Sequence, residues 1–386
     1  MIIKYGFSVI GKSHIKKGTC CQDSHAIKEL ENGWTIAVVG DGVGSAKNSE
    51  KGSKIAVEAV VSFCEQFFPW DGSLLSIKSM LRTAYNFALK RIIKESKTSK
   101  EPLDSYDTTL TTVIYDGSRI VFAHSGDGGI IGLNSFGDYS LITKPQKGKD
   151  GISVIPLRFG DSKWVIDTYE EDLSAVLLVT DGMLDILTPY LLRNNENYLD
   201  GVYVPLATFF SDPRGFLDNN NLQNVIQSIN DFVSNDADYN PLEFYSRLRS
   251  IYTAIIADDA NSVVETIINT NVPISLMESV SDDKTIVVII NNTMPIDIKE
   301  PEYYAEPDWK QKQEAWNRIA YPHLYAHERT DITQSDQSRI VDESSSESAV
   351  NDSNEHEVET PSKTEESKEY NGLKETIKSI KKLFNN

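Results

Sequence analysis

Aspartate residues stand at the ends of several apolar, β-branched segments of this sequence, where a buried strand would meet its loop. They are Asp23 before the first long strand, Asp41 after TIAVVG, Asp127 after IVFAHSG, Asp181 after AVLLVT, and Asp282 and Asp283 before KTIVVII. One Asp-Gly pair alone is typical of a turn. A charge at the rim of a core, however, must be paired or must bind a cation. Because several strands of one sheet can bring such ends together, the set favours a shared acidic site.

Such a site would offer carboxylate oxygens as its ligands. The sequence contains no cluster of histidines or cysteines to match the aspartates, and an all-oxygen ligand field suits Mg²⁺ or Mn²⁺ rather than zinc. Two such ions held close together would polarise a phosphoryl group and generate a hydroxide nucleophile. The residue types therefore indicate metal-assisted chemistry at a phosphoryl group.

The segment AVVGDGVGSAKNS, residues 37–49, admits three interpretations: a tight turn, a phosphate-binding loop, or a metal ligand at a strand end. It matches neither G-x-x-x-x-G-K-[ST] nor G-x-G-x-x-G, and Asp41 in its middle would repel a phosphate. A turn and a metal ligand are compatible, because Gly42 lets the chain turn closely enough for its carbonyl to reach a cation. We expect Asp41 and the Gly42 carbonyl to face the same ions.

Apolar patterning predicts the elements that would position these side chains. Residues 1–295 alternate between strand and helix signals. β-Branched runs predict strands and amphipathic spacing predicts helices, while an alternating segment with an Asp116-Gly117 turn predicts an antiparallel meander. The expected elements are strands at 35–40, 175–182 and 284–291, the meander over 108–142, helices at 49–68 and 73–96, and a mainly helical region at 186–262.

The composition changes after about residue 295. Residues 296–330 are aromatic and polar without a clean period, and we treat them as an extension. Residues 331–370 contain twelve acidic and three basic side chains. Such a segment cannot bury enough apolar surface to become ordered, so we expect a disordered acidic linker. Residues 371–386 place apolar side chains on one helical face and lysines elsewhere, which indicates either a short basic amphipathic helix that docks on a protein or a frayed tail.

Composition also limits the classes of function and location. The net charge of −19 argues against a general nucleic-acid-binding protein, which needs a basic surface. Three cysteines cannot form a disulfide framework and fit a reducing compartment. The longest apolar runs are strand-sized and far short of the ~20 residues of a membrane helix. We expect a cytoplasmic protein without a transmembrane segment.

Five acidic motifs follow one another along the chain: QD at 22–23, DGVGS at 41–45, GDGG at 126–129, TDGMLD at 180–185 and DDKT at 282–285. In order and rough spacing they resemble the motifs of the metal-dependent protein phosphatase family, type 2C. The form DGVGSAKNS resembles the bacterial branch of that family. The resemblance covers about residues 1–295 and implies a catalytic domain over that range.

The resemblance implies an α+β fold, with a central sandwich of two antiparallel sheets flanked by helices in α-β-β-α layers. The region at 186–262 falls where the family carries a variable flap beside the site. The implied reaction is hydrolysis of phosphoserine and phosphothreonine, without a covalent intermediate, by a water or hydroxide that a binuclear Mn²⁺ or Mg²⁺ centre activates. The implied partners are phosphoprotein substrates and a serine/threonine kinase or its targets.

The resemblance also implies a role for each motif residue. Asp41 is expected to bridge both ions, the Gly42 carbonyl to hold one of them, and Asp181 and Asp282 to hold the other. Asp23 is expected to order water around the ions, and Gln22, where relatives often have Glu, to coordinate through its amide oxygen. Asp127 and Asp185 are expected to build a weaker third metal site. Residues that order a metal's surroundings matter nearly as much as its ligands. Asp283 is expected to be a cap or loop residue instead.

Two departures from the family pattern concern substrate binding and proton donation. Many members carry a phosphate-binding Arg where this chain has Gly18, so the positive charge would have to come from His14, Lys16 or Lys17. A lysine would supply a point charge rather than the bidentate fork of an arginine. Eukaryotic members often have a proton-donating His where this chain has Val43. The alternative function is therefore a catalytically silent, phosphatase-like binding or scaffold module.

Overall fold

The computed structural model describes residues 2–30, 32–193, 201–211, 281–291, 293–305 and 307–325. The acidic linker predicted at 331–370 and the amphipathic helix predicted at 371–386 lie outside the described residues. Most of the helical region predicted at 186–262 lies outside them as well. These three expectations therefore stay predictions.

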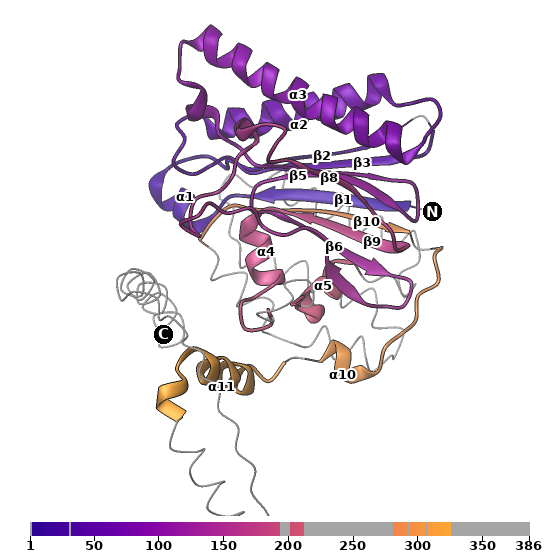
Figure 1. Cartoon of the computed structure of the whole chain (residues 1–386), viewed down its shortest axis with the longest axis vertical. Helices are drawn as coiled ribbons and strands as arrows, with labels where there is room; N and C mark the ends of the chain where they lie inside the picture. The colour runs from indigo at the N-terminus through magenta and orange to yellow at the C-terminus, as the bar shows by residue number, and fades with distance from the viewer. Residues whose placement is uncertain are drawn as a thin grey trace, which may run out of the picture. The chain divides into compact units, whose positions relative to one another are not determined.

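Two five-stranded antiparallel sheets form the centre of the fold (Figure 1). Sheet A consists, in spatial order, of β1 (Ile2–Val9), β10 (Lys284–Asn291), β9 (Leu173–Val179), β6 (Gly129–Asn134) and β7 (Tyr139–Leu141). Sheet B consists of β2 (Ser24–Glu29), β3 (Thr35–Gly40), β4 (Leu110–Tyr115), β5 (Ile120–Ser125) and β8 (Val165–Tyr169). The antiparallel sandwich that the family resemblance implied is confirmed.

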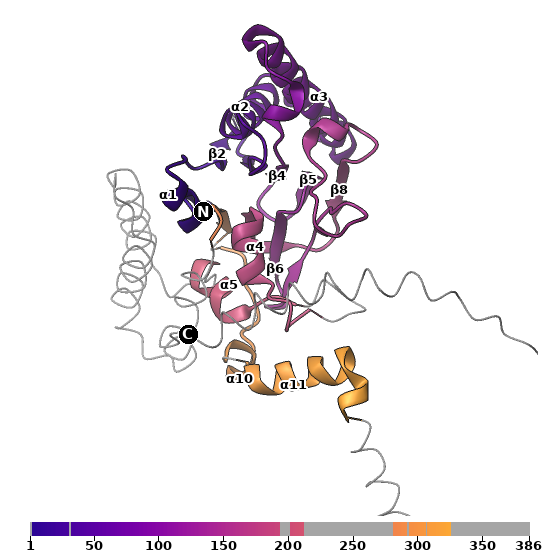
Figure 2. The same ribbon diagram turned by 90° about the vertical axis from the view of Figure 1, so that its left-hand side faces the viewer.

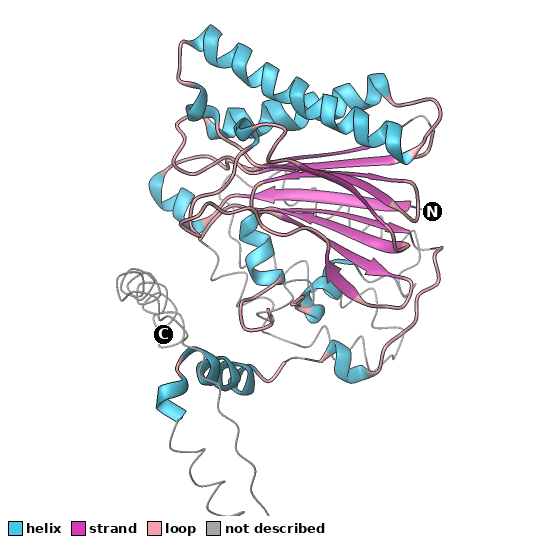
Figure 3. Ribbon diagram, viewed as in Figure 1, coloured by secondary structure: helices cyan, strands magenta, loops and turns pink. Residues whose placement is uncertain are grey.

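Helices cover the outer face of each sheet and complete four layers (Figures 1 and 3). The covering helices are α2 (Ser49–Phe67) and α3 (Leu74–Ser99) on sheet B, and α4 (Asp181–Leu187) and α5 (Val204–Ser211) on sheet A. Figure 2 shows the same order of layers from a second side. The predicted helices at 49–68 and 73–96 are confirmed, and Ser73 caps α3 by accepting a hydrogen bond from the Ser76 amide.

Each boundary between layers holds its own apolar core, and this explains the uninterrupted apolar runs of the inner strands. In β3, Ile36 and Val38 pack toward the helices, whereas Ala37 and Val39 pack between the sheets. The side chains of a strand alternate between its two faces, so a strand buried on both faces needs apolar residues at every position. β9 is likewise fully buried along its whole length.

The segment predicted as one meander over 108–142 is divided between the two sheets. β4 and β5 form a hairpin in sheet B, whereas β6 and β7 belong to sheet A. The chain passes from one sheet to the other at residues 126–128, and Asp127 lies in this crossing. The sequence shows the same alternation and the same turn residues whether consecutive strands share one sheet or lie in two. The strands were therefore predicted in the right places, but the prediction that all of them pair in one meander was wrong.

Several elements were not predicted from the sequence, and one predicted strand extended too far. The missed elements include β1, β8, the six-residue helix α1 (Lys12–Lys17), and the helices α10 (Pro301–Tyr304) and α11 (Trp309–Ala320) of the extension. β8 is an edge strand with exposed residues, and α1 is too short to show a period. The strand predicted at 175–182 ends at Val179, and Asp181 instead begins α4.

The chain divides into two compact units, Met1–Gln313 and Glu314–Asn386, and the strands described all belong to the first. The remaining short elements are η1 (Leu103–Tyr106), η2 (Leu157–Phe159), α10 (Pro301–Tyr304), α11 (Trp309–Ala320) and η4 (Pro322–Tyr325). Among the described helices, none combines the length and the hydrophobicity that crossing a lipid bilayer requires. The predicted domain end at residue 295 stays a prediction.

Candidate metal centre

Strand register brings the acidic motifs to one end of the sandwich. The start of β2 pairs with the end of β3, and the starts of β6 and β10 both pair with the end of β9. The paired residues are Ser24 with Gly40, Gly129 with Val179, and Ile286 with Val179. The connections before β2, after β3, before β6, after β9 and before β10 therefore meet at the same end.

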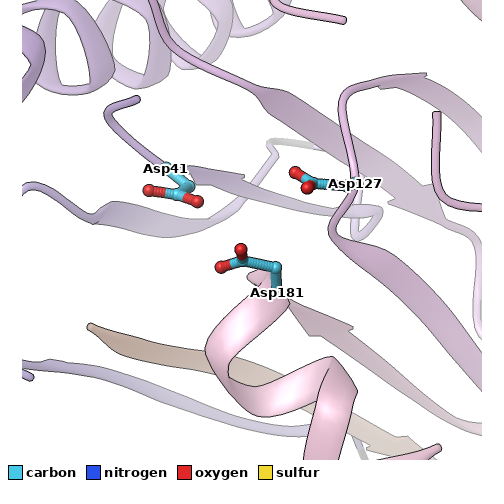
Figure 4. Close-up of side chains that lie close together, drawn as sticks. All are labelled: Asp41, Asp127 and Asp181. Atoms are coloured by element: carbon cyan, nitrogen blue, oxygen red, sulfur yellow. The ribbon is translucent and has the colours of Figure 1, made fainter. Parts of the chain in front are cut away.

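The carboxylates of Asp41, Asp127 and Asp181 converge at this end (Figure 4). Each offers an oxygen, and these oxygens all lie within 4.8 Å of one another. Asp41 follows β3, Asp127 lies between β5 and β6, and Asp181 begins α4. Three separate connections thus aim carboxylates at a common point, which is the arrangement that an oxygen-liganded divalent cation requires.

The backbone of Asp41 is fixed by the two threonines that precede β4. The amide of Asp41 donates to Thr109 Oγ1 at 3.0 Å. Its carbonyl accepts from the Thr109 amide at 2.8 Å and from Thr108 Oγ1 at 2.9 Å. These bonds tie the loop after β3 to the neighbouring strand, so the direction of the Asp41 side chain is set by the sheet.

Gly42 is required by close packing. Its amide donates to the Gln22 carbonyl at 3.1 Å. A Cβ atom at this position would lie 2.7 Å from the Ser49 backbone and 2.8 Å from the Gln22 carbonyl oxygen. No side chain fits in that space, so glycine keeps this turn tight beside Asp41.

Asp23 is a buried carboxylate, 7% exposed, held by two threonine hydroxyls. Thr180 and Thr285 each donate to Asp23 Oδ2, at 2.8 Å and 2.7 Å. The other oxygen, Oδ1, is buried without a hydrogen-bond partner, and so is Gln22 Oε1. Two buried acceptors that lack donors beside converging carboxylates fit a cation with its bound waters.

Burial and mutual repulsion raise the pKa values of the clustered carboxyl groups. Desolvation first, then the charge of Asp283, raises the pKa of Asp23 to about 7. Desolvation first, then the charge of Asp127, raises the pKa of Asp181 to about 8. The pKa of Asp41 is raised well above its usual value by desolvation and then by Asp23. A divalent cation would remove this penalty, because it favours the ionised form of each carboxyl.

The family model for protein phosphatase 2C matches residues 10–226, which is more than half of the 386 residues of the chain. The chain belongs to the protein phosphatase 2C family. The resemblance drawn from the five acidic motifs is therefore confirmed.

Several solved phosphatase structures are similar to this chain at low identity. Stp1, a serine/threonine phosphatase from Staphylococcus aureus, is 13% identical with a TM-score of 0.44, over 75% of this chain and 95% of its own. The catalytic domain of PstP, solved with two manganese ions, is 15% identical with a TM-score of 0.43, over 75% of this chain and 97% of its own. PppA from Pseudomonas aeruginosa is 14% identical with a TM-score of 0.41, over 75% of this chain and 97% of its own. No curated protein matches the chain in sequence.

In this phosphatase 2C chain, the raised pKa values predict a link between pH, metal and stability. The carboxyls of Asp23 and Asp181 have folded-state pKa values of about 7 and about 8, above the ordinary 3.8. The unfolded chain ionises these groups more easily, so the free energy of unfolding of the metal-free protein should fall as the pH rises from about 4 to about 8. Thermal unfolding at about pH 5.5 and about pH 8, with EDTA and with Mn²⁺, measures the effect. Mn²⁺ should stabilise more at the higher pH, and equal stabilisation at both would contradict the expectation.

Asp282 and Asp283 are neighbours in sequence but have opposite environments. The side chain of Asp282 is 57% exposed, and its charge contributes to the raised pKa values of Asp41 and Asp181. Asp283 is 2% exposed and accepts from the amides of Gly11 and Gln22, each at 2.6 Å. Asp283 therefore ties the loops before α1 and β2 to β10, while Asp282 lies close enough for its charge to act on Asp41 and Asp181 but is not one of the three converging carboxylates.

The three residues predicted to bind the substrate phosphate lie on α1, in two kinds of environment. His14 is 7% exposed, and its Nδ1 lies 2.9 Å from Asp283 Oδ1 while its Nε2 lies 4.0 Å from Asp282 Oδ1. Lys16 and Lys17 are exposed and make no ion pair with any residue of the described ranges. The structure thus places His14 beside the acidic site and leaves the two lysines at the surface.

Lys284, which was not among the candidate residues predicted from the sequence, is completely buried at the start of β10. Its Nζ donates to the Asp282 carbonyl at 3.1 Å. Burial lowers the pKa of its amine, and the charges of Asp283 and Asp282 act in the opposite direction. Lys284 therefore places a basic side chain among the acidic residues at this end of the sandwich. The signal in the sequence was a lysine two residues ahead of the apolar run IVVII.

The structure separates the two residues predicted to form a third metal site. Asp127 lies with Asp41 and Asp181 in the central group. Asp185 lies on α4 with a side chain that is 72% exposed, and Arg193 is its ion-pair partner. The sequence spacing of these residues does not show this division, because it depends on how α4 leaves the sheet.

Proposed function

We propose that this chain is a phosphoprotein phosphatase that hydrolyses phosphoserine and phosphothreonine with a binuclear Mn²⁺ or Mg²⁺ centre. The observation that carries the proposal is the convergence of Asp41, Asp127 and Asp181 within 4.8 Å of one another. The partnerless buried acceptors of Asp23 and Gln22 beside them support it. Membership of the protein phosphatase 2C family supports the same reaction.

In this proposal most residues of the site either hold a metal ion or orient water. Asp41, the Gly42 carbonyl, Asp181 and Asp282 would hold the ions, Asp23 would orient water around them, and Asp127 adds negative charge beside Asp41 and Asp181. Thr180 and Thr285 fix Asp23 through its Oδ2, and Oδ1, which has no hydrogen-bond partner, would be available for that task. When bound, two divalent ions supply polarisation of the phosphoryl group and a strong nucleophile at neutral pH.

Positive charge for the substrate would come from α1. Lys16 and Lys17 are exposed and free to meet a phosphorylated peptide. His14 would supply positive charge beside Asp282 when protonated, since its Nε2 lies 4.0 Å from that carboxylate. The substrates would be phosphoproteins of the cytoplasm, among them a serine/threonine kinase or its targets, and residues 371–386 would dock on a partner.

Release of inorganic phosphate from a phosphothreonine peptide tests the proposal. The full chain with Mn²⁺ should turn over, and EDTA should abolish turnover until Mn²⁺ is restored in excess. Turnover that continues in EDTA would contradict a metal-dependent reaction. A phosphotyrosine peptide of the same sequence serves as the matched control and should be hydrolysed more slowly.

The second candidate is a catalytically silent, phosphatase-like scaffold. Gly18 and Val43 favour it, because relatives often place a phosphate-binding Arg and a proton-donating His at these positions. Calorimetry separates the two candidates. Mn²⁺ binding without turnover on any phosphoserine or phosphothreonine peptide would favour the scaffold, whereas binding with turnover supports the enzyme.

A further inference from the structure

Lys147 reaches the carboxylate cluster from a loop outside the acidic motifs. Its Nζ lies 3.7 Å from Asp127 Oδ2. The Asp127 side chain is only 8% exposed, whereas the Lys147 side chain is 44% exposed. The lysine therefore places its charge at the rim of the cluster, against the carboxylate that the sequence analysis gave to a third metal ion.

The loop that carries Lys147 is fixed to the segment that carries Asp127. The Gln146 amide donates to the Gly126 carbonyl at 2.7 Å, and the Gly126 amide donates to Gln146 Oε1 at 3.2 Å. Lys147 also forms an isolated β-bridge with Val154. These contacts hold the backbone on both sides of the pair, so the fold itself sets lysine beside aspartate.

Arg193 holds the other carboxylate predicted for the third ion. Its Nη2 lies 3.3 Å from Asp185 Oδ1. Its Nε donates to the Thr188 carbonyl at 2.5 Å, and its Nη2 donates to Thr188 Oγ1 at 3.3 Å. The guanidinium is thus fastened to the end of α4 while it neutralises Asp185.

The charges of the site balance with two divalent ions once these cations are included. The carboxylates at and around the cluster are Asp23, Asp41, Asp127, Asp181, Asp185 and Asp282. Asp283 also acts on Asp23, and the opposite charge of Lys284 balances it. Fully ionised, these six groups carry six negative charges. Lys147 and Arg193 supply two positive charges, and two divalent ions supply the other four. Without the two basic residues, the same balance would need a third divalent ion.

We propose that Lys147 and Arg193 take the place of a third divalent cation in this chain, so that its acidic site loads two ions. The proposal rests on the metal centre of the proposed function. Lys147 Nζ lies 3.7 Å from Asp127 Oδ2 and Arg193 Nη2 lies 3.3 Å from Asp185 Oδ1, so each carboxylate already has a positive partner where a further ion would bind. The prediction that Asp127 and Asp185 form a third metal site is replaced by two internal ion pairs.

The test is the number of Mn²⁺ ions bound by the full chain, measured by equilibrium dialysis and metal analysis. The wild type should bind two ions, and Lys147→Met combined with Arg193→Met should bind three. Lys147→Met alone should tighten the weakest detectable Mn²⁺ binding at least tenfold. Lys149→Met is the matched control: it removes an exposed lysine of the same loop and should leave the binding curve unchanged.

Adding Asp127→Asn to the double variant should remove the additional ion and so assign it to this carboxylate. Lys147 is partly exposed, so its single variant should fold, as circular dichroism would verify. Three ions on the wild type, or two on the double variant, would overturn the proposal. A wild type that binds no Mn²⁺ would instead overturn the metal centre itself, and the inference with it.

Discussion

Replacement of Asp41 by asparagine is expected to lower kcat/KM on a phosphothreonine peptide by about three orders of magnitude. Asp41 is one of the three converging carboxylates, and the proposed function assigns it to both ions. Loss of its charge would remove metal-dependent stabilisation of roughly 4 kcal/mol, which corresponds to about a thousandfold in rate. The measurement is steady-state phosphate release at saturating Mn²⁺, together with a calorimetric Mn²⁺ titration.

The matched control for this experiment is Asp161→Asn. Asp161 pairs with Arg82 at 3.0 Å on the surface, with a side chain that is 48% exposed. Exposed pairs contribute little to stability, so this variant should retain wild-type kcat/KM within about twofold. Asp41→Asn with unchanged kcat/KM would remove the basis for a catalytic metal centre. A loss of activity in both variants would point to a general loss of folded protein.

The second large effect is a difference in stability between alanine variants of the neighbours Asp282 and Asp283. Asp283→Ala should lower the free energy of unfolding by about 3–5 kcal/mol, because it leaves two buried amides and the ring of His14 without their carboxylate. The amides are those of Gly11 and Gln22. Asp282→Ala should change the stability of the metal-free protein by less than about 0.5 kcal/mol, since the side chain is exposed. Urea unfolding in EDTA measures both.

In Mn²⁺ binding the order of the two alanine variants should be reversed, with Asp282→Ala showing the larger effect. Asp282→Ala should weaken Mn²⁺ binding, because this residue is assigned as a ligand, although the fold is intact. Asp283→Asn keeps one oxygen acceptor and should lose less stability than Asp283→Ala. If Asp282→Ala proves the more destabilising of the two alanine variants, the division into a metal-facing and a structural aspartate is wrong.

Several features of this protein could be predicted from its sequence. The order of five acidic motifs was sufficient for the family, and apolar runs located most of the inner strands. β3 illustrates why: a strand between two apolar layers must be apolar at every position, and such a run stands out in a sequence. Long amphipathic helices such as α2 and α3 show their period over many residues and were also located correctly.

Other features depended on contacts between distant residues. The sequence could not show which of Asp282 and Asp283 is buried, because the amides that bind Asp283 lie 272 and 261 residues away. It could not divide the segment 108–142 between two sheets, because alternation shows that a strand has two faces but not which strand pairs with it.

The sequence by itself therefore determined the family, the main inner strands and the aspartates of the acidic motifs. Only the tertiary structure decided how charge is distributed around them. Lys147 and Arg193 lie outside the acidic motifs and Lys284 lies within the last of them, and each is brought to its acidic neighbours by the packing of the sandwich. Electrostatic interaction depends on distance in space and on burial, and neither can be read from spacing along the chain.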